Sequence, residues 1–268
     1  MNDLSDVSIL MPAFNGQADV ERTLASFRES STIHVLIVDD GSTPPIVAPV
    51  IDGMEIDILR MPKNGGIERA LEAGMSALAA RGVRYAARID SGDLATPGRL
   101  AKQRAYLEAH PSVAVLGMWT HVVSTEGAPL FDLTPPAEPA TIRRTMLART
   151  CFTHPSLMLR VDAVIEAGNY RAEYRAAEDL DLLLRLMQRH DGANLPEFGL
   201  FYELNESGIS ATKRRVQVMS TLRLQLRYLR VTNPRDWAGV AKSIAHLALP
   251  YRALRRLKAR LLKSASSA

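Results

Sequence analysis

The sequence predicts an α/β fold built around a mainly parallel sheet. Residues 35–38 form an apolar, mostly β-branched run that is typical of a buried strand, and the turn-forming Gly41 and Ser42 follow it. From residue 7 to residue 118, stretches with a strand pattern alternate with stretches of helical periodicity. Such alternation favours parallel strands that are joined by right-handed helical crossovers.

Each element of this part has its own pattern. The apolar run 7–11, closed by Pro12, predicts the first strand, and residues 17–30 carry apolar side chains at spacings of four and three, as a helix packed on a sheet does. Residues 67–81 have high helix propensity and one face of small and apolar side chains. Further strands are predicted at 34–38, 56–60, 85–89 and 113–118, with a helix at 97–109.

The rest of the chain is less regular. Residues 124–141 are rich in Pro and Ala and are predicted to form a loop, as are residues 191–212. A short strand is predicted at 156–159, and helices at 178–190 and 215–231. Alternate leucines in the last segment would also suit a strand, but its apolar side chains share one helical face, so we prefer a helix.

Length and composition indicate an ordinary globular chain. Its 268 residues, 47% hydrophobic and 23% charged, are enough for one sizeable core and a small extension. The single cysteine, Cys151, excludes an internal disulfide and fits a reducing compartment. The first residues lack the pattern of a secretory signal, and no stretch approaches the roughly 20 apolar residues of a membrane-spanning helix. We therefore expect a cytoplasmic protein.

Basic charge is concentrated towards the C-terminus. Residues 213–268 hold 14 Lys/Arg and one acid, whereas residues 1–212 hold 19 Lys/Arg and 28 Asp/Glu. We expect a main domain at 1–212 and a basic helical extension at 213–268. Residues 249–263 combine six cations with leucines at helical spacing, a profile typical of a helix on an anionic membrane surface, here the inner face of the cell membrane. Docking on the acidic main domain is the second interpretation; nucleic acid is disfavoured because aromatics are few and no recognised binding module is present.

Acidic side chains cluster where predicted elements begin or end. Asp39 and Asp40 follow one predicted strand, Asp90 and Asp93 follow another, and a third group lies at 178–181. Open α/β sheets bind ligands at the carboxyl ends of their strands. Because gathered carboxylates repel one another, this arrangement indicates a cation, a basic partner or a hydroxyl-rich substrate.

Six short motifs occur in order between about residues 6 and 205. They are Met11–Asn15, Val38–Ser42, Asn64–Gly66, Arg88–Asp90 with Pro97, Arg99 and Leu100, Thr153–Ser156, and Glu178–Asp179 with Arg185. Together they resemble family-2 glycosyltransferases of the GT-A type, including those that make bacterial surface polysaccharides. The resemblance implies a Rossmann-like sheet flanked by helices, to which the basic helical extension is added. It also implies inverting transfer of a sugar from a nucleotide donor to a hydroxyl of a glycan or lipid-linked acceptor.

The resemblance places the nucleotide sugar in the half at about 1–120 and the acceptor in the half at about 121–212. Asp40 resembles the residue that accepts the N3–H of uridine, which points to a UDP-linked donor, although Asp-Gly-Ser also forms ordinary turns. Pro12, Asn64 and Asp90 are the other candidate donor-binding residues. Asn64 opens the Asn-Gly-Gly segment before a predicted helix, where backbone N–H groups suit a diphosphate, but a plain turn is equally consistent.

The metal motif departs from the family. The family usually places a metal-binding carboxylate where this chain has Gly92, between the remaining candidates Asp90 and Asp93. A bound Mn²⁺ or Mg²⁺ would absorb charge on the leaving diphosphate. Gly92 permits positive φ, which would let Asp93 turn inward in place of the missing ligand. Weak metal binding, or basic side chains in its place, are the alternatives.

Asp179 is the candidate general base, a role taken from the resemblance. An inverting transfer needs one carboxylate to accept the proton of the attacking hydroxyl, whereas on spacing alone Glu178 and Asp179 would be an ordinary acidic first turn of a helix. His154, Glu178 and Asp181 are candidates for acceptor contacts or for supporting the site, with Arg185 the other partner open to Asp181. The Gln-x-x-Arg-Trp signature of processive synthases is absent, which indicates transfer of one sugar per encounter.

Two other classes remain open. Gly92 would also suit a non-catalytic homologue that binds nucleotide sugar as an assembly partner. A sugar nucleotidyltransferase would share the early strand–helix alternation, but residues 12–16 lack the expected Gly-rich loop with its Arg and Lys. A dehydrogenase is disfavoured because no Gly-x-Gly-x-x-Gly follows a strand.

Overall fold

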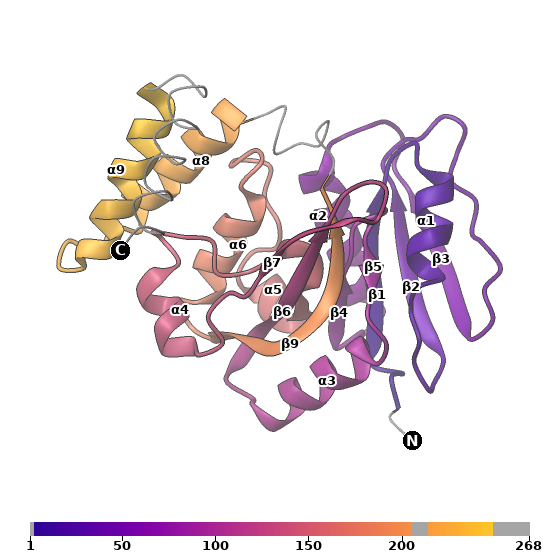
Figure 1. Ribbon diagram of the computed structural model, residues 1–268. Coiled ribbons are helices and arrows are strands. Elements are labelled where there is room, and N and C mark those ends of the chain that lie inside the picture. The colour runs from indigo at the N-terminus through magenta and orange to yellow at the C-terminus, as the bar shows by residue number, and fades with distance from the viewer. Residues whose placement is uncertain (1–2, 205–213, 249–268) are drawn as a thin grey trace.

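A computed structural model describes residues 3–204 and 214–248 and shows a curved sheet flanked by helices (Figure 1). The strands are β1 (Val7–Ala13), β2 (Ile33–Asp39), β3 (Met54–Arg60), β4 (Tyr85–Arg88), β5 (Leu94–Ala95), β6 (Val113–Val123), β7 (Pro129–Leu133), β8 (Met158–Arg160) and β9 (Asp191–Glu203). The helices are α1 (Gln17–Leu24), α2 (Ile67–Ala80), α3 (Arg99–Ala109), α4 (Pro139–Thr145), α5 (Val161–Glu166), α6 (Glu178–Leu186), α8 (Arg214–Arg227) and α9 (Pro234–Ala248), with a 3₁₀ turn at His154–Ser156.

The sheet is mainly parallel, which confirms the predicted fold class. In the described part of the chain its order is β3-β2-β1-β4-β8-β6-β9-β5, and β7 pairs with β6. The strands β1, β2, β3, β4, β6 and β9 run in one direction, while β5, β7 and β8 run against them. Antiparallel β8 lies between β4 and β6 and so joins an N-terminal parallel block to a second, smaller one.

Alternation along the parallel strands sends apolar side chains into two separate cores. Leu10, Leu36 and Val38 pack in the core that contains α2, α5 and α6. Their neighbours Ile9, Met11, Val35 and Ile37 point to the opposite face of the sheet, where α1 and α3 pack. Gly74 allows α2 to approach the sheet closely, because a Cβ there would collide with Leu10 and Val38.

Two predicted loops contain regular structure, and those predictions were wrong. The segment 124–141 contains β7 and the start of α4. The segment 191–212 begins with β9, which pairs in parallel with β6 along nearly its whole length. Gly192, Pro196 and Gly199 interrupt the apolar alternation of β9, and the pairing accommodates this with register shifts. A strand of this kind lacks the period-2 pattern on which the prediction relied.

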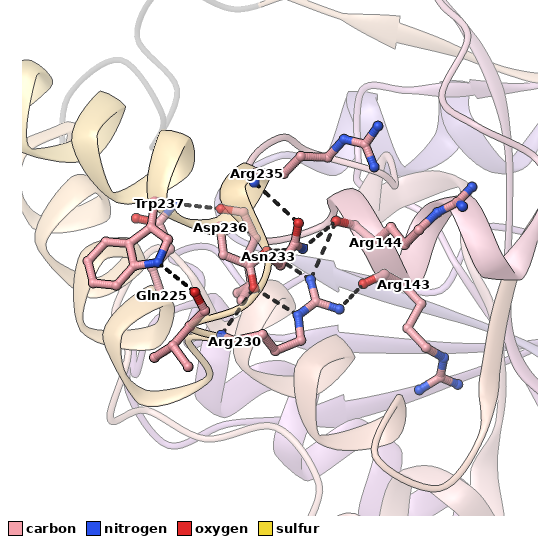
Figure 2. Close-up of polar contacts among 10 residues, drawn as sticks. Arg143, Arg144, Gln225, Arg230, Asn233, Arg235, Asp236 and Trp237 are labelled. Carbon is pink, nitrogen blue, oxygen red and sulfur yellow. Dashed lines mark hydrogen bonds and ion pairs between the residues drawn. The ribbon is translucent and has the colours of Figure 1, made fainter.

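The predicted helix at 215–231 is confirmed as α8, which pairs with α9 to form a helical hairpin at one end of the molecule (Figure 1). Leu224 of this hairpin is fully buried in the core that contains α2 and α6. Arg230 connects the hairpin to the rest of the fold, because its guanidinium binds the buried Asp236 and donates to the carbonyls of Arg143 and Arg144 (Figure 2).

The predicted membrane-binding segment at 249–263 lies outside the described residues, and the division of the chain at residue 212 stays a prediction. Within residues 3–204 and 214–248, no helix is both long and apolar enough to cross a membrane.

Candidate active site

The candidate active site lies at the edge of the sheet where β1, β2 and β4 end. These parallel strands are neighbours in the order β2-β1-β4, although β4 comes after β3 in the chain. The point where strand order reverses is the place where open α/β sheets leave a crevice for ligands. The residues that follow β2 and β4 are Asp40 and Ile89-Asp90, so two of the predicted acidic groups meet at this crevice.

Asp40 organises the side of this edge that was predicted to bind the nucleotide. Its Oδ1 accepts a hydrogen bond from the N–H of Gly65 at 2.7 Å, and its Oδ2 accepts one from Gly66 at 2.9 Å. Pro12 lies beside Val38 in the β1–β2 register, and Gly41 packs against the backbone of Asn64. The predicted residues Pro12, Asp40 and Asn64 are therefore brought together, and the 64–66 segment is held at the start of α2.

Asp39, the other acid of this pair, maintains the turn itself. Its fully buried carboxylate accepts hydrogen bonds from the N–H groups of Ser42 and Ile46 and lies 3.4 Å from Nη1 of Arg60. Burial alone would raise the pKa of Asp39, but these hydrogen bonds outweigh burial and lower it. The carboxylate of Asp39 is thus used by hydrogen bonds within the turn, so Asp40 is the candidate for binding a ligand.

A cavity of about 490 Å³ adjoins this edge. It collects most of the remaining predicted site residues, which come from three distant parts of the chain: Asp90, Asp93, His154, Glu178 and Asp179. Asp40 does not line the cavity, but Ile67, the residue after its partner Gly66, does. The candidate residues for binding the sugar donor and the candidate general base, Asp179, therefore border one continuous region.

Asp181 is not brought to this cavity. It is buried, and its Oδ2 lies 2.7 Å from Nη2 of Arg185. Arg185 also donates to the carbonyls of Ala167 and Asn169. The pair therefore ties α6 to the segment after α5, which is the second of the two interpretations that the sequence left open.

Arg88 is a site residue to which sequence reasoning gave no role. Its side chain is 1% exposed, it lines the cavity, and its Nη1 lies 2.6 Å from Oδ1 of Asp90. None of its three side-chain nitrogens makes a well-aligned hydrogen bond with a described residue. Burial alone would lower the pKa of Arg88, but Asp90 and other nearby groups raise it overall. An arginine inside a short, buried strand was the available signal, because such residues are almost never buried without a partner.

Three carboxyl groups near Arg88, those of Asp93, Glu178 and Asp179, are harder to ionise than usual. Burial, followed by repulsion from Asp90, raises the pKa of Asp93 well above its ordinary value. Burial and then the charge of Asp179 raise the pKa of Glu178 to about 8, and burial raises that of Asp179. Perturbed carboxyl groups that line one cavity are typical of a functional site.

His154 has a neutral ring in this environment. Its Nε2 lies 3.0 Å from the hydroxyl of Tyr170. Burial and then the charge of Arg88 lower the pKa of His154 well below its ordinary value. The histidine is therefore suited to hold the cavity wall or to hydrogen-bond a ligand, and unsuited to carry a positive charge.

The residues around Gly92 fit a divalent cation that shares its coordination with substrate. Gly92 adopts φ +110° and donates its N–H to Oγ1 of Thr23, and Asp93 turns into the cavity wall. Oδ1 of Asp93 accepts a hydrogen bond from the N–H of Glu203, whereas its buried Oδ2 has no partner among the described residues. The described residues include no cluster of three or more His, Cys, Asp or Glu side chains that could hold a metal. Asp90 and Asp93 could thus supply two ligands, as Mg²⁺ sites completed by phosphate and water require.

The fold is that of a GT-A glycosyltransferase. Residues 8–167 match the family model described as glycosyl transferase family 2. Because the match covers more than half of the chain, the protein belongs to glycosyltransferase family 2. Membership decides against the nucleotidyltransferase alternative.

Curated relatives agree with this assignment. The chain is 28% identical over 199 residues to amylovoran biosynthesis glycosyltransferase AmsE of Erwinia amylovora, an alignment covering 71% of this chain and 73% of AmsE. It is 30% identical over 226 residues to EpsE of Bacillus subtilis (strain 168), covering 80% and 78% of the two chains.

Solved structures share the fold at low sequence identity. TarS of S. aureus (residues 1–349, in complex with UDP) superposes with a TM-score of 0.62 at 16% identity, covering 91% of this chain and 72% of TarS. Mannosyltransferase PcManGT of Pyrobaculum calidifontis, in complex with GDP-Man and Mn²⁺, gives a TM-score of 0.62 at 15% identity, covering 96% and 80%.

The buried position of Arg88 leads to a testable expectation. The substitution Arg88→Gln should lower the free energy of unfolding by about 1–3 kcal/mol at pH 8, because the surrounding carboxylates then lose their buried cation. The loss should be smaller at pH 5, because Asp93, Glu178 and Asp179, whose pKa values are raised, take up protons as the pH falls. Urea denaturation at both pH values measures the difference. The control is Arg84→Gln, whose side chain is 51% exposed and pairs with Glu108; a loss at Arg88 that matches this control, or that does not depend on pH, would contradict the role of Arg88.

Proposed function

We propose that the protein transfers one sugar per encounter, with inversion, from a UDP-linked donor to a hydroxyl of a glycan or lipid-linked acceptor during polysaccharide biosynthesis. The observation that carries the proposal is the single cavity that joins the Arg88, Asp90 and Asp93 group to Asp179. AmsE is named for the biosynthesis of a polysaccharide, which supports this class of product. Solved relatives are complexes with UDP, UDP-GlcNAc and GDP-Man, which supports a nucleotide-sugar donor.

Asp40 retains the capacity to bind the base. An ionised carboxylate offers about four lone-pair sites, and the N–H groups of Gly65 and Gly66 occupy two of them. The remaining lone pairs can accept the N3–H of uracil, and the same hydrogen bonds keep the carboxylate oriented. Pro12 and Asn64 would border the nucleotide at this edge.

Asp179 would accept the proton of the acceptor hydroxyl. The hydroxyl oxygen attacks the anomeric carbon from the face opposite the diphosphate, the new C–O bond forms, and the bond from the anomeric carbon to the phosphate oxygen breaks. The nucleoside diphosphate leaves with the electron pair of that bond, so the anomeric configuration inverts. Asp179 suits this role because its carboxylate lies at the cavity and burial raises its pKa above the ordinary value.

Asp90 and Asp93 would hold a Mn²⁺ or Mg²⁺ ion together with diphosphate oxygens. When bound, the cation neutralises the negative charge that develops on the leaving group. The buried guanidinium of Arg88 lies on the same wall and adds fixed positive charge there. Glu178 and His154 would also border the bound ligands, because both line the same cavity.

A donor panel tests the function. Nucleoside diphosphate release should appear with a UDP-sugar, an acceptor mixture and Mn²⁺ or Mg²⁺, and should fall at least tenfold with a chelator, because phosphate charge is then less well neutralised. A parallel panel of GDP-sugars tests whether the protein selects the uracil base of the donor. Nucleotide binding by calorimetry without turnover across the panel would contradict the proposal and favour the non-catalytic assembly partner.

The substitution Asp179→Asn should reduce kcat by 10²- to 10⁴-fold, the range for loss of a general base. UDP affinity should stay within twofold, because the carboxylate acts on the acceptor. Steady-state kinetics and calorimetry on the same preparation measure both quantities. Glu173→Gln removes an exposed acid from the preceding segment and is the matched control; full turnover by Asp179→Asn would remove the assignment of the base.

The pH dependence of kcat provides a separate check on Asp179. Since the base must be ionised, kcat should fall as the pH drops through a pKa above the ordinary Asp range. Because the pKa of Glu178 is raised to about 8, this residue is protonated and neutral over the acid limb of Asp179. The substitution Glu178→Gln should therefore leave the acid limb in place. A limb that moves to lower pH would show that Glu178 is charged there and that its pKa is not raised.

A further inference from the structure

A second cavity, of about 270 Å³, lies on the other side of Asp179. Its walls come from residues 146–152, α6, α8 and α9. Asp179, Phe152 and Gln217 line both this cavity and the one described above, so the two meet at the proposed general base. Most of the wall residues lie beyond residue 167, where the match to the family model ends. The hairpin of α8 and α9 therefore forms part of the cavity wall, outside the residues that match the family model.

The walls are fixed by specific contacts between the hairpin and the main fold. Nε2 of Gln225 donates to the carbonyl of Leu147 at 2.7 Å, and Oγ of Ser220 donates to the carbonyl of Arg175 at 2.9 Å. Gly239 lets α9 pack directly on the backbone of Leu147 and Ala148, where a Cβ would collide. Asn233 adds a hydrogen bond to the carbonyl of Arg144 (Figure 2). These contacts fix the position of the α8–α9 hairpin on the main fold, and so they fix the walls of the cavity.

One wall residue has an unsatisfied acceptor. Gln225 is 4% exposed, and its Oε1 is buried with no partner among the described residues. The hydrogen bond from Nε2 to Leu147 fixes which end of the amide is the oxygen. A buried acceptor without a donor is costly, and a hydroxyl group of a ligand would satisfy it. Thr150, Thr221 and Gln217 add further hydroxyl and amide groups to the lining, as a sugar requires.

The rim of the cavity is positively charged. Arg149 and Lys242 line it, both are exposed, and neither makes an ion pair with a described residue. Asp179 is the one acid among the described lining residues. Burial and then the charges of Arg214 and Lys242 lower the pKa of His246, which agrees with an excess of positive charge at this place. A ligand that fills the cavity would therefore meet cations around its outer end.

We propose that this cavity is the acceptor subsite, and that it binds a glycoside carrying an anionic group next to the accepting sugar. The sugar would place one hydroxyl at Asp179 and donate another to Oε1 of Gln225, while Arg149 and Lys242 bind the anion. The anion is either a phosphate ester or a sugar carboxylate, since both match the two cations. This inference rests on the proposed glycosyltransfer at Asp179.

Binding measurements test the subsite with the donor side filled. Calorimetry would use a saturating concentration of the nucleoside diphosphate that binds most tightly, with Mg²⁺. The probes are a hexose 1-phosphate, a methyl hexuronide and a methyl hexoside, each in the gluco and galacto series. At least one anionic probe should bind tenfold more tightly than the neutral one, and the 1-phosphate and uronide arms identify which anion is preferred.

The variants Lys242→Gln and Arg149→Gln should each weaken binding of that probe about tenfold, as expected for one charge-assisted hydrogen bond. Both side chains are exposed, so the fold should persist, and unchanged nucleotide affinity verifies this. Arg235→Gln, an exposed cation on α9 outside the cavity lining, is the matched control.

Failure of the subsite and failure of the proposed function can be told apart. The subsite alone is overturned if nucleotide binding and turnover are normal but the binding tests fail. They fail if no anionic probe binds, if anionic probes bind no better than the neutral one, or if the variants keep full affinity. Absence of nucleotide binding overturns the proposed function instead.

Discussion

The acidic crevice depends on one buried positive charge. Asp90, Asp93, Glu178 and Asp179 line a single cavity, and the guanidinium of Arg88 is buried among them on its wall. Isolated carboxylates pay a large desolvation cost inside a protein, and like charges add to it. Arg88 offsets part of that cost, yet the pKa values of three of these acids stay raised. Burial is the main cause of these raised pKa values, and a bound divalent cation would favour the ionised carboxylates.

The fold divides the chemistry between two structural regions. The ends of β1, β2 and β4 provide rigid positions for Asp40 and Asp90, because these strands are buried and fixed in register. The other region begins at α6 and includes β9 and the α8–α9 hairpin, which surround Asp179. The first region falls within the residues that match the family model, and much of the second falls outside it.

The strands and acids that a local pattern encodes could be predicted from the sequence. The strand β2 is a continuous apolar run, so its position and the acids after it were evident. The strand β9 was not, because Gly192, Pro196 and Gly199 interrupt its pattern and its pairing with β6 is a long-range contact. Local patterns also could not separate Asp39 from Asp40, since only the fold shows which carboxylate the turn consumes. Spacing offered Arg185 as a partner of Asp181, but it could not show that Arg185 also binds the carbonyls of Ala167 and Asn169.

The start of α6 explains how one carboxylate can serve both cavities. The residue before the helix, Ala177, offers no side-chain cap, so the first-turn N–H groups depend on nearby acids. Asp179 provides one such acceptor, because its Oδ1 accepts a hydrogen bond from the N–H of Leu180 at 2.7 Å. That hydrogen bond lowers its pKa, whereas burial raises it more strongly. Asp179 is thus anchored to a helix while its carboxylate remains at the boundary of two cavities, where it can contact a ligand on either side, as the proposed proton transfer requires.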